Sequence, residues 1–433
     1  MDNFNPPTGD IDHKKYTTGG WPAHKTLIIL FVIYLSDYAD RSVVASMINF
    51  IKQDWNITDA QAGWLISIVL LFITVFTMPA AILIDRWSRR KMVAIMTFFW
   101  SVATLACAFT KSYTQLLIAR AFIGIGEAGY APGGSAMLAA AYREEDRAKV
   151  LGLWNASIPL GMGIGLAAGG IIARRWGWHH AFGIVAFPGM LLALGAWFLP
   201  DYKSVKVEES AAGLKEGESF IAQSIKIFRI PSLTFAYLGF AMNVSATTAL
   251  MSWLPTYFER TGIAKEGQGG MISSGIFALV LFGAPLGGVI ADRWRKTYKK
   301  ARMMFPAITS LIASAILMAA TLSVHDKTML LVLFAVFGVC VTLFVAPAAA
   351  VTQDVVHPGL RAFSYGMCVL VQHVLGDIWS PPLVGKISDI IGLEHALMFV
   401  PIYGVFAAML FYIGSRFYER DLERVEKIEL EAE

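Results

Sequence analysis

Apolar stretches of about 20 residues recur along the whole chain and alternate with short polar segments. A helix rises 1.5 Å per residue and the hydrocarbon core of a bilayer is about 30 Å thick, so each stretch can cross a membrane once. The pattern predicts an all-α membrane protein with twelve transmembrane helices. We place them at 26–50, 60–84, 92–110, 114–141, 148–173, 180–199, 233–258, 268–291, 302–323, 328–350, 361–385 and 394–416.

The longest polar segment between two predicted spans covers residues 200–232 and divides the chain into two halves of six spans. Its last part, 220–228, has the apolar spacing of a helix that lies on the membrane surface. The expected division is a tail at 1–25, a bundle at 26–199, a linker at 200–232, a bundle at 233–416 and a tail at 417–433.

The two halves carry the same short motif after their second spans, Asp85-Arg86-Trp87 and Asp292-Arg293-Trp294. Internal repeats of this kind are typical of secondary transporters, in which two halves rock around a central site. Most lysines and arginines of the loops fall on the side that the tails and the linker share, and such loops stay in the cytoplasm. We therefore expect both termini in the cytoplasm and the protein in a bacterial inner membrane.

Composition narrows the function. The 433 residues are 16% charged, whereas soluble domains carry about 25%. The net charge of +4 is small, and the basic residues cluster in the loops between spans. We therefore expect no nucleic-acid partner. Cys107, Cys340 and Cys368 fall within spans and predict packing roles, so neither a metal site nor a cofactor is expected. No nucleophile, base and orienting group are spaced as a set, which argues against an enzyme.

The fourth span contains Arg120 and Glu127, seven residues apart on one helix face. An arginine or an acid at the centre of a bilayer costs roughly 2.5–3.5 kcal/mol, so this face must contact protein or water. Such a pair indicates an intramembrane ion pair or proton site. The alternative is a structural pair that holds neighbouring helices together.

The first span contains three more ionisable residues, Asp37, Asp40 and Arg41. Asp37 and Arg41 are four residues apart and can pair on one face, whereas Asp40 points elsewhere. A dry cavity favours a protonated carboxyl group and a nearby arginine favours the carboxylate. Opening and closing a cavity could therefore couple Asp37, Asp40 and Glu127 to protons. The alternative is a fixed salt-bridge cluster.

The second half offers further polar candidates. In the eleventh span, His373 and Asp377 are four residues apart and predict a second polar site, with Gln372 beside it. His373 and Asp377 are therefore further candidates for proton coupling. In the seventh span, neutral polar residues are expected to line a cavity opposite Arg120. We expect the two arginines to contact the substrate, because guanidinium groups bind phosphate or carboxylate groups well. The full set of residues that we expect to contact the substrate is Arg41, Arg120, Asn243, Thr247, Trp253 and Gln372.

The segment that begins at Asp85 resembles the loop signature of the major facilitator superfamily, G-x-x-x-D-R-x-G-x-R-R. Ala81 and Ser88 replace the two glycines. In the family, this loop makes charge contacts that keep the cytoplasmic side closed in the outward-open state. The resemblance implies gating roles for Asp85, Arg86, Arg90, Asp292 and Arg293.

Four motifs together resemble the Spinster family: Asp-Tyr-x-Asp-Arg in span one, Gly-Ile-Gly-Glu-Ala in span four, Ile-Pro-Leu-Gly-x-Gly-Ile-Gly in span five and His-Val-Leu-Gly-Asp-x-x-Ser-Pro in span eleven. That family carries lysophospholipids and sphingosine phosphates, and some members are proton-coupled. The chain departs from the family at Asp37, where asparagine is usual. Organic-anion symporters of the same superfamily also carry Tyr-x-Asp-Arg in span one.

These observations predict a monomeric, proton-coupled secondary transporter of the major facilitator type that works by alternating access. The expected partners are protons, the lipid bilayer and an amphipathic anion such as a lysophospholipid or a sphingolipid phosphate. A small organic anion, such as a carboxylate or a sugar acid, is the alternative substrate. A membrane-embedded enzyme or sensor is the alternative from another class.

Overall fold

The computed structural model describes residues 20–142, 144–200, 220–323, 326–356 and 360–424, and every regular element in those ranges is a helix. Ten stretches form helices that are long and apolar enough to cross a membrane. The prediction of an all-α membrane protein is confirmed. Most of the predicted tails and linker lies outside the described residues, so the boundaries at 1–25, 200–232 and 417–433 stay predictions.

The described residues of the first half form nine α-helices and a 3₁₀ turn, and hydrogen-bonding side chains begin several of them. At the start of α3, the side chains of Thr58 and Gln61 each accept a hydrogen bond from the other residue's backbone N–H, which forms a capping box. The elements are α1 (Gly20–Val43), η2 (Val44–Ser46), α2 (Ile48–Trp55), α3 (Asp59–Arg86), α4 (Arg89–Cys107), α5 (Tyr113–Glu127), α6 (Tyr130–Ala141), α7 (Glu144–Asn155), α8 (Ser157–Trp176) and α9 (Trp178–Trp197).

The second half begins with α10 (Phe220–Phe228), the helix expected at the end of the linker. A π-helical turn, η5, interrupts the eleventh span of the chain. The elements that follow α10 are α11 (Pro231–Arg260), α12 (Gly269–Arg295), α13 (Ala301–Leu322), α14 (Lys327–Cys340), α15 (Val345–Asp354), α16 (Arg361–Gln372), η5 (His373–Asp377), α17 (Ser380–Ile391), α18 (Leu393–Leu397) and α19 (Pro401–Glu423).

The halves repeat one another at the level of backbone angles. Span five ends at Gly177 with φ 90° and ψ 154°, and span eleven ends at Gly392 with φ 86° and ψ 154°. Glycine adopts a positive φ without steric cost, which explains the residue type at both sites. The next helix starts immediately in each half, at Trp178 and at Leu393. The internal repeat indicated by the two Asp-Arg-Trp motifs is therefore present in the fold.

Two expected spans, 26–50 and 114–141, are not among the ten apolar helices. The first carries three charged residues in α1 and then breaks into η2 and α2. The second is split into α5 and α6 at Ala128 and Gly129. These two spans hold all the ionisable residues proposed for the first half's polar site. The local irregularities therefore coincide with the site.

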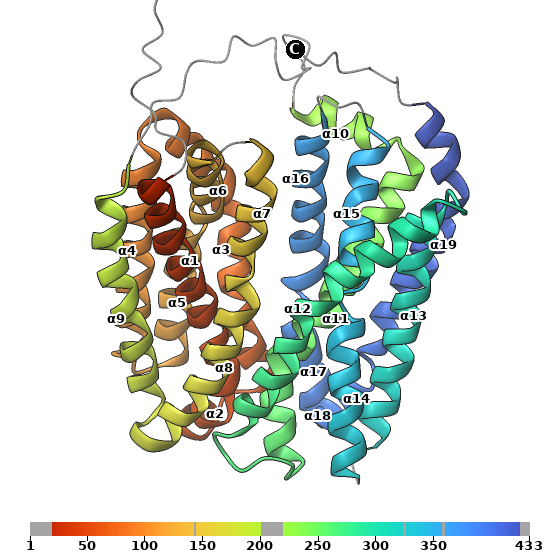
Figure 1. Ribbon diagram of the computed structural model, residues 1–433. Coiled ribbons are helices and arrows are strands. Elements are labelled where there is room, and N and C mark those ends of the chain that lie inside the picture. Colours follow the sequence, from red (N-terminus) through yellow and green to blue (C-terminus); the bar gives the residue numbers. More distant parts are fainter. Residues whose placement is uncertain (1–19, 143, 201–219, 324–325, 357–359, 425–433) are drawn as a thin grey trace, which may run out of the picture.

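The two halves stand side by side, and they meet at the end of the molecule opposite to the linker (Figure 1). There α3 packs on α17 and α8 packs on α12. Glycines permit the first contact: a Cβ atom at Gly63 or at Gly385 would overlap the backbone of Pro381 or of Asp59. In span five, by contrast, Gly161 packs against α1 of its own half.

Candidate functional site

Arg41 of α1 is the centre of the buried charged cluster in the first half. Its guanidinium pairs with Asp37 Oδ2 at 2.8 Å and with Glu127 Oε2 at 2.9 Å. The predicted pair of Asp37 and Arg41 is confirmed. Glu127 pairs with Arg41 rather than with Arg120, which corrects the ion pair expected within span four. The reason is distance, because seven residues separate two positions by about 10 Å along a helix axis.

Asp40 lies one step around α1 and faces α4. Its Oδ2 accepts a hydrogen bond from Thr104, while its Oδ1 is buried and has no hydrogen-bond partner in the described part of the chain. The residue is only 3% exposed. Burial of a carboxylate without a full set of hydrogen-bond partners costs free energy.

Arg120 of α5 is 1% exposed, and its surroundings differ from those of Arg41. Its Nε donates to the backbone carbonyl of Leu65 on α3. Its Nη1 is buried and has no hydrogen-bond partner among the described residues. The cluster as a whole contains the carboxyl groups of Asp37, Asp40 and Glu127 but only two guanidinium groups. It would therefore carry a net charge of −1 if every group were ionised.

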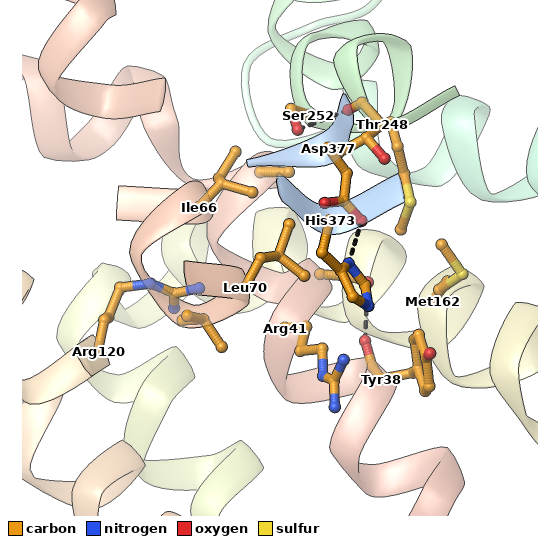
Figure 2. A pocket seen from close by; sticks show the side chains of 14 residues that line it. Tyr38, Arg41, Ile66, Leu70, Arg120, Met162, Thr248, Ser252, His373 and Asp377 are labelled. Atoms are coloured by element: carbon orange, nitrogen blue, oxygen red, sulfur yellow. Dashed lines mark hydrogen bonds and ion pairs between the residues drawn. The ribbon is translucent and has the colours of Figure 1, made fainter. Parts of the chain in front are cut away.

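A cavity of about 160 Å³ lies between the two halves (Figure 2). One part of its wall is polar and the rest is apolar, with one methionine from each half. The first half contributes Tyr38, Arg41, Ser42, Ala45, Ile66, Val69, Leu70, Arg120 and Met162, and the second half contributes Thr248, Met251, Ser252, His373 and Asp377.

The π-helical turn η5 supplies the polar face of the second half. His373 Nδ1 lies 2.8 Å from Asp377 Oδ2, as the spacing of four residues predicts. Figure 2 shows the imidazole of His373 between Asp377 and Tyr38 of α1, so it spans the cavity from one half toward the other. Short π-helical segments are often found at functional sites. Asp377 is 5% exposed, and its Oδ1 has no partner in the described ranges.

Four residues expected to contact substrate lie outside the set that lines this cavity. Asn243 donates to Ser310 Oγ, and Thr247 donates to the backbone carbonyl of Asn243. Trp253 donates to the carbonyl of Pro381, and Gln372 donates to Cys368 Sγ. Their hydrogen bonds are made within the second half.

The seventh span does line the cavity, but through the adjacent face. Thr248, Met251 and Ser252 of α11 line it, and the two hydroxyl residues, Thr248 and Ser252, are four positions apart. They are the immediate neighbours of Thr247 and Trp253. The sequence offered a signal for this face, since both are hydroxyl residues one helical turn apart.

The residues expected to gate the transporter fall into three groups. The side chains of Asp85 and Arg86 lie outside the description. Arg90 donates to the carbonyl of Leu199 at the end of α9, within its own half. Asp292 pairs with Arg302 at 2.9 Å, and Arg293 is exposed beside it.

Arg302 was not singled out by its sequence context, yet it links the second motif to the rest of its half. It pairs with Asp292 at the end of α12 and with Asp354 at the end of α15, the latter at 2.7 Å. Tyr418 of α19 also donates to Asp354. Three helix ends are therefore tied together by one guanidinium group.

Known proteins share this architecture. Residues 30–381 match the family model of the Major Facilitator Superfamily. Protein spinster homolog 1 of Xenopus tropicalis is 30% identical over 432 residues, which covers 92% of this chain and 82% of that protein. The sphingosine-1-phosphate transporter SPNS2 of Xenopus tropicalis is 28% identical, with 93% and 83% covered.

The fold is also that of a solved structure. A crystal structure of a bacterial homologue of the human lysosomal transporter Spinster, inward-facing and unoccupied, gives a TM-score of 0.82 at 20% identity, over 93% of this chain and 99% of that chain. The chain is thus a multi-pass integral membrane transporter that belongs to the major facilitator superfamily and, within it, to the Spinster family.

Proposed function

We propose that this transporter moves an amphipathic anion, such as a lysophospholipid or a sphingolipid phosphate, by alternating access and in exchange for or together with protons. The observation that carries the proposal is the cavity between the halves. It combines a buried arginine, whose Nη1 has no partner in the described part of the chain, with an apolar wall. A phosphate or carboxylate would satisfy that donor, because charge-assisted hydrogen bonds to guanidinium are among the strongest in proteins.

The apolar wall selects for an aliphatic portion next to the anionic group. Ile66, Val69, Leu70, Met162 and Met251 form it. Methionine side chains adapt to ligands of varied shape. A cavity of about 150 Å³ holds one benzene molecule, so 160 Å³ holds a phosphate or carboxylate group with a short aliphatic portion but not a whole lysolipid. The remainder of the chain would extend between the helices of the two halves.

The charge balance of the first-half cluster supports proton coupling. Three carboxyl groups face two guanidinium groups, so one bound proton makes the cluster neutral. Protonation of Glu127 would remove one of the two acids that hold Arg41, which would free Arg41 for the substrate anion. Asp37 and Asp40 are the other proton carriers of the cluster. His373 and Asp377 form the second titratable pair, on the opposite wall.

The relatives support the lipid class of substrate. One of them is named as a sphingosine-1-phosphate transporter. The distribution of basic residues among the loops favours an orientation in which the linker end of the molecule and both termini face the cytoplasm. We further propose that the protein is a monomer in a bacterial inner membrane. In this conformation the two halves contact each other at the end opposite to the linker. The gate that forms when the linker end closes would consist of Asp85, Arg86, Arg90, Asp292 and Arg293.

The test is uptake into proteoliposomes. We expect an imposed pH gradient to drive uptake of a labelled lysophospholipid, and we expect Glu127→Gln to abolish the gradient dependence. Glu423→Gln, an exposed acid at the end of α19, is the matched control and should transport normally. An equal rate of uptake with and without the pH gradient would contradict proton coupling.

A small organic anion is the second candidate substrate, favoured by the volume of only about 160 Å³. The same vesicles distinguish the two. Movement of a labelled small carboxylate in the absence of lysophospholipid movement would reject the lipid proposal and leave the role of the arginines in place.

A further inference from the structure

A second cavity, of about 360 Å³, lies at the linker end of the second half, far along the chain from the transport site. It lies between the end of α10, the start of α11, the end of α19 and three residues near the ends of α15 and α16, namely Val355, Val356 and Leu360. Figure 1 shows α10 at this end, beside the ends of α15 and α16. The cavity therefore joins the linker helix to the ends of α11, α15, α16 and α19.

The lining of this cavity is positively charged. Lys226 and Arg229 contribute from α10 and the residue after it, and Arg424 contributes from the end of α19. The described residues of the lining include one acid, Asp421, which is 4% exposed. Its carboxylate already accepts from the backbone N–H of Ser232 at 3.0 Å and pairs with Arg420 at 3.2 Å. Among the described residues of the lining, Arg229 and Arg424 therefore stand beside one acid that already has partners.

The floor of the cavity and the adjoining face of α10 are apolar. Val355 and Val356 are 2% and 3% exposed and form part of the floor. On α10, Ile225 and Phe228 are 48% and 41% exposed, on either side of the basic residue Lys226. Apolar side chains exposed beside basic ones on one short helix are typical of helices that lie in the interface of a membrane.

We propose that this cavity is a binding site for the headgroup of an anionic phospholipid from the leaflet at the linker end. The phosphodiester group would sit between Arg229 and Arg424, and the acyl chains would follow Ile225 and Phe228 into the bilayer. Arginine binds phosphate oxygens in a bidentate manner, and basic pockets between membrane helices hold anionic headgroups. The bound lipid would fasten the linker helix to the ends of α16 and α19.

The experiment measures lipid binding by the full-length protein. Detergent-purified protein is titrated with phosphatidylglycerol or with phosphatidylcholine, and lipid adducts are counted by native mass spectrometry. We expect specific adducts with phosphatidylglycerol. The double variant Arg229→Gln/Arg424→Gln should bind it about 30-fold more weakly, the loss expected for two cations near an anionic headgroup. The variant Arg229→Lys/Arg424→Lys keeps both charges and should keep most of the binding.

The matched control is Lys296→Gln/Lys299→Gln, which removes two exposed charges from the turn between α12 and α13. An equal loss of phosphatidylglycerol binding in this control would show that exposed basic residues elsewhere contribute as much as those of the cavity. The proposed binding site would then be rejected. Glycerol 3-phosphate and inorganic phosphate are tested as competitors. If either displaces the lipid at a concentration close to the lipid's own Kd, the cavity takes a soluble phosphate and the lipid proposal is wrong.

A substitution in the transport cavity separates this proposal from the proposed function. Arg120→Gln should leave phosphatidylglycerol binding unchanged, because Arg120 lies in the other half and lines a different cavity. If Arg120→Gln removed the adducts, the lipid would occupy the transport site instead and the second site would be rejected.

Discussion

Arg41 and Arg120 line one cavity but stand in different electrostatic surroundings. Arg41 is held by two carboxylates, whereas Arg120 has a buried Nη1 without a partner among the described residues. We predict that Arg120→Gln raises the half-saturating concentration of an anionic substrate at least tenfold, since a hydrogen bond to a charged group contributes about 1.5–3 kcal/mol. The measurement is initial uptake rate against substrate concentration in proteoliposomes.

The control for this prediction is Arg120→Lys, which keeps the charge and should recover part of the affinity. A neutral lipid substrate analogue provides the second comparison, and its transport should change little in Arg120→Gln. An equal loss for the anion and for the neutral analogue would mean that Arg120 serves packing of α5 against α3 rather than recognition of the anion.

Asp37 gives the cluster its excess negative charge, because without it two carboxyl groups would face two guanidinium groups. We predict that Asp37→Asn weakens the dependence of uptake on the pH gradient by roughly tenfold while substrate still binds. The cluster would then be neutral with no proton bound, so binding would no longer require one. The measurement is uptake with and without an imposed gradient in the same vesicles. Unchanged gradient dependence would assign the coupling proton to Asp40 or to the pair of His373 and Asp377.

At the residue scale, the sequence predicts contacts along a helix better than contacts between helices. The pairs Asp37–Arg41 and His373–Asp377 could be predicted because four residues make one helical turn. The partner of Glu127 could not, because it depends on how α1 and α5 pack. Thr248 lines the cavity while Thr247 bonds within α11, and a rotation of one residue around a helix decides between them.

At the scale of elements, the sequence predicts where spans occur, and most of their breaks become visible only in the structure. Hydropathy placed the eleventh span at 361–385 and gave no sign of the π-helical turn within it. The turn arises from one extra residue in the helical ladder, which leaves composition unchanged. Span four likewise divides at Gly129, where a small residue is compatible with both a packed helix and a break.

The packing of α3 on α17 depends on two glycines. We predict that Gly385→Val drives the two helices apart, because its Cβ would overlap the backbone of Asp59. We expect the population of the conformation described here to fall at least tenfold relative to the conformation in which these helices are apart. The distance distribution between spin labels on α8 and α12 measures the two populations. Gly366→Val is the matched control, since a Cβ at Gly366 meets nothing within 4 Å, and it should leave the distance distribution unchanged.

At the scale of the whole molecule, the halves are joined by a polar network at the end opposite to the linker. Arg260 of α11 donates from Nη1 and Nη2 to the two carboxylate oxygens of Asp59, at 2.7 and 2.8 Å. Asp389 of α17 accepts from the backbone N–H groups of Asp59 and Ala60, so one half caps the first turn of a helix in the other. Ser388 donates to Asp59 as well.

This network must break when the halves separate at that end, so it biases the conformational equilibrium of the transporter. We predict that Arg260→Gln shifts the population about tenfold toward the state that is open at the end opposite to the linker, a change of about 1.4 kcal/mol. The labels on α8 and α12 report it, and Lys265→Gln, an exposed charge at the same end, should show no shift. A ligand changes such an equilibrium only by its differential affinity for the two states. The variant should therefore alter the apparent affinity for substrate on the two faces in opposite directions, an outcome that a loss of folding stability would not produce.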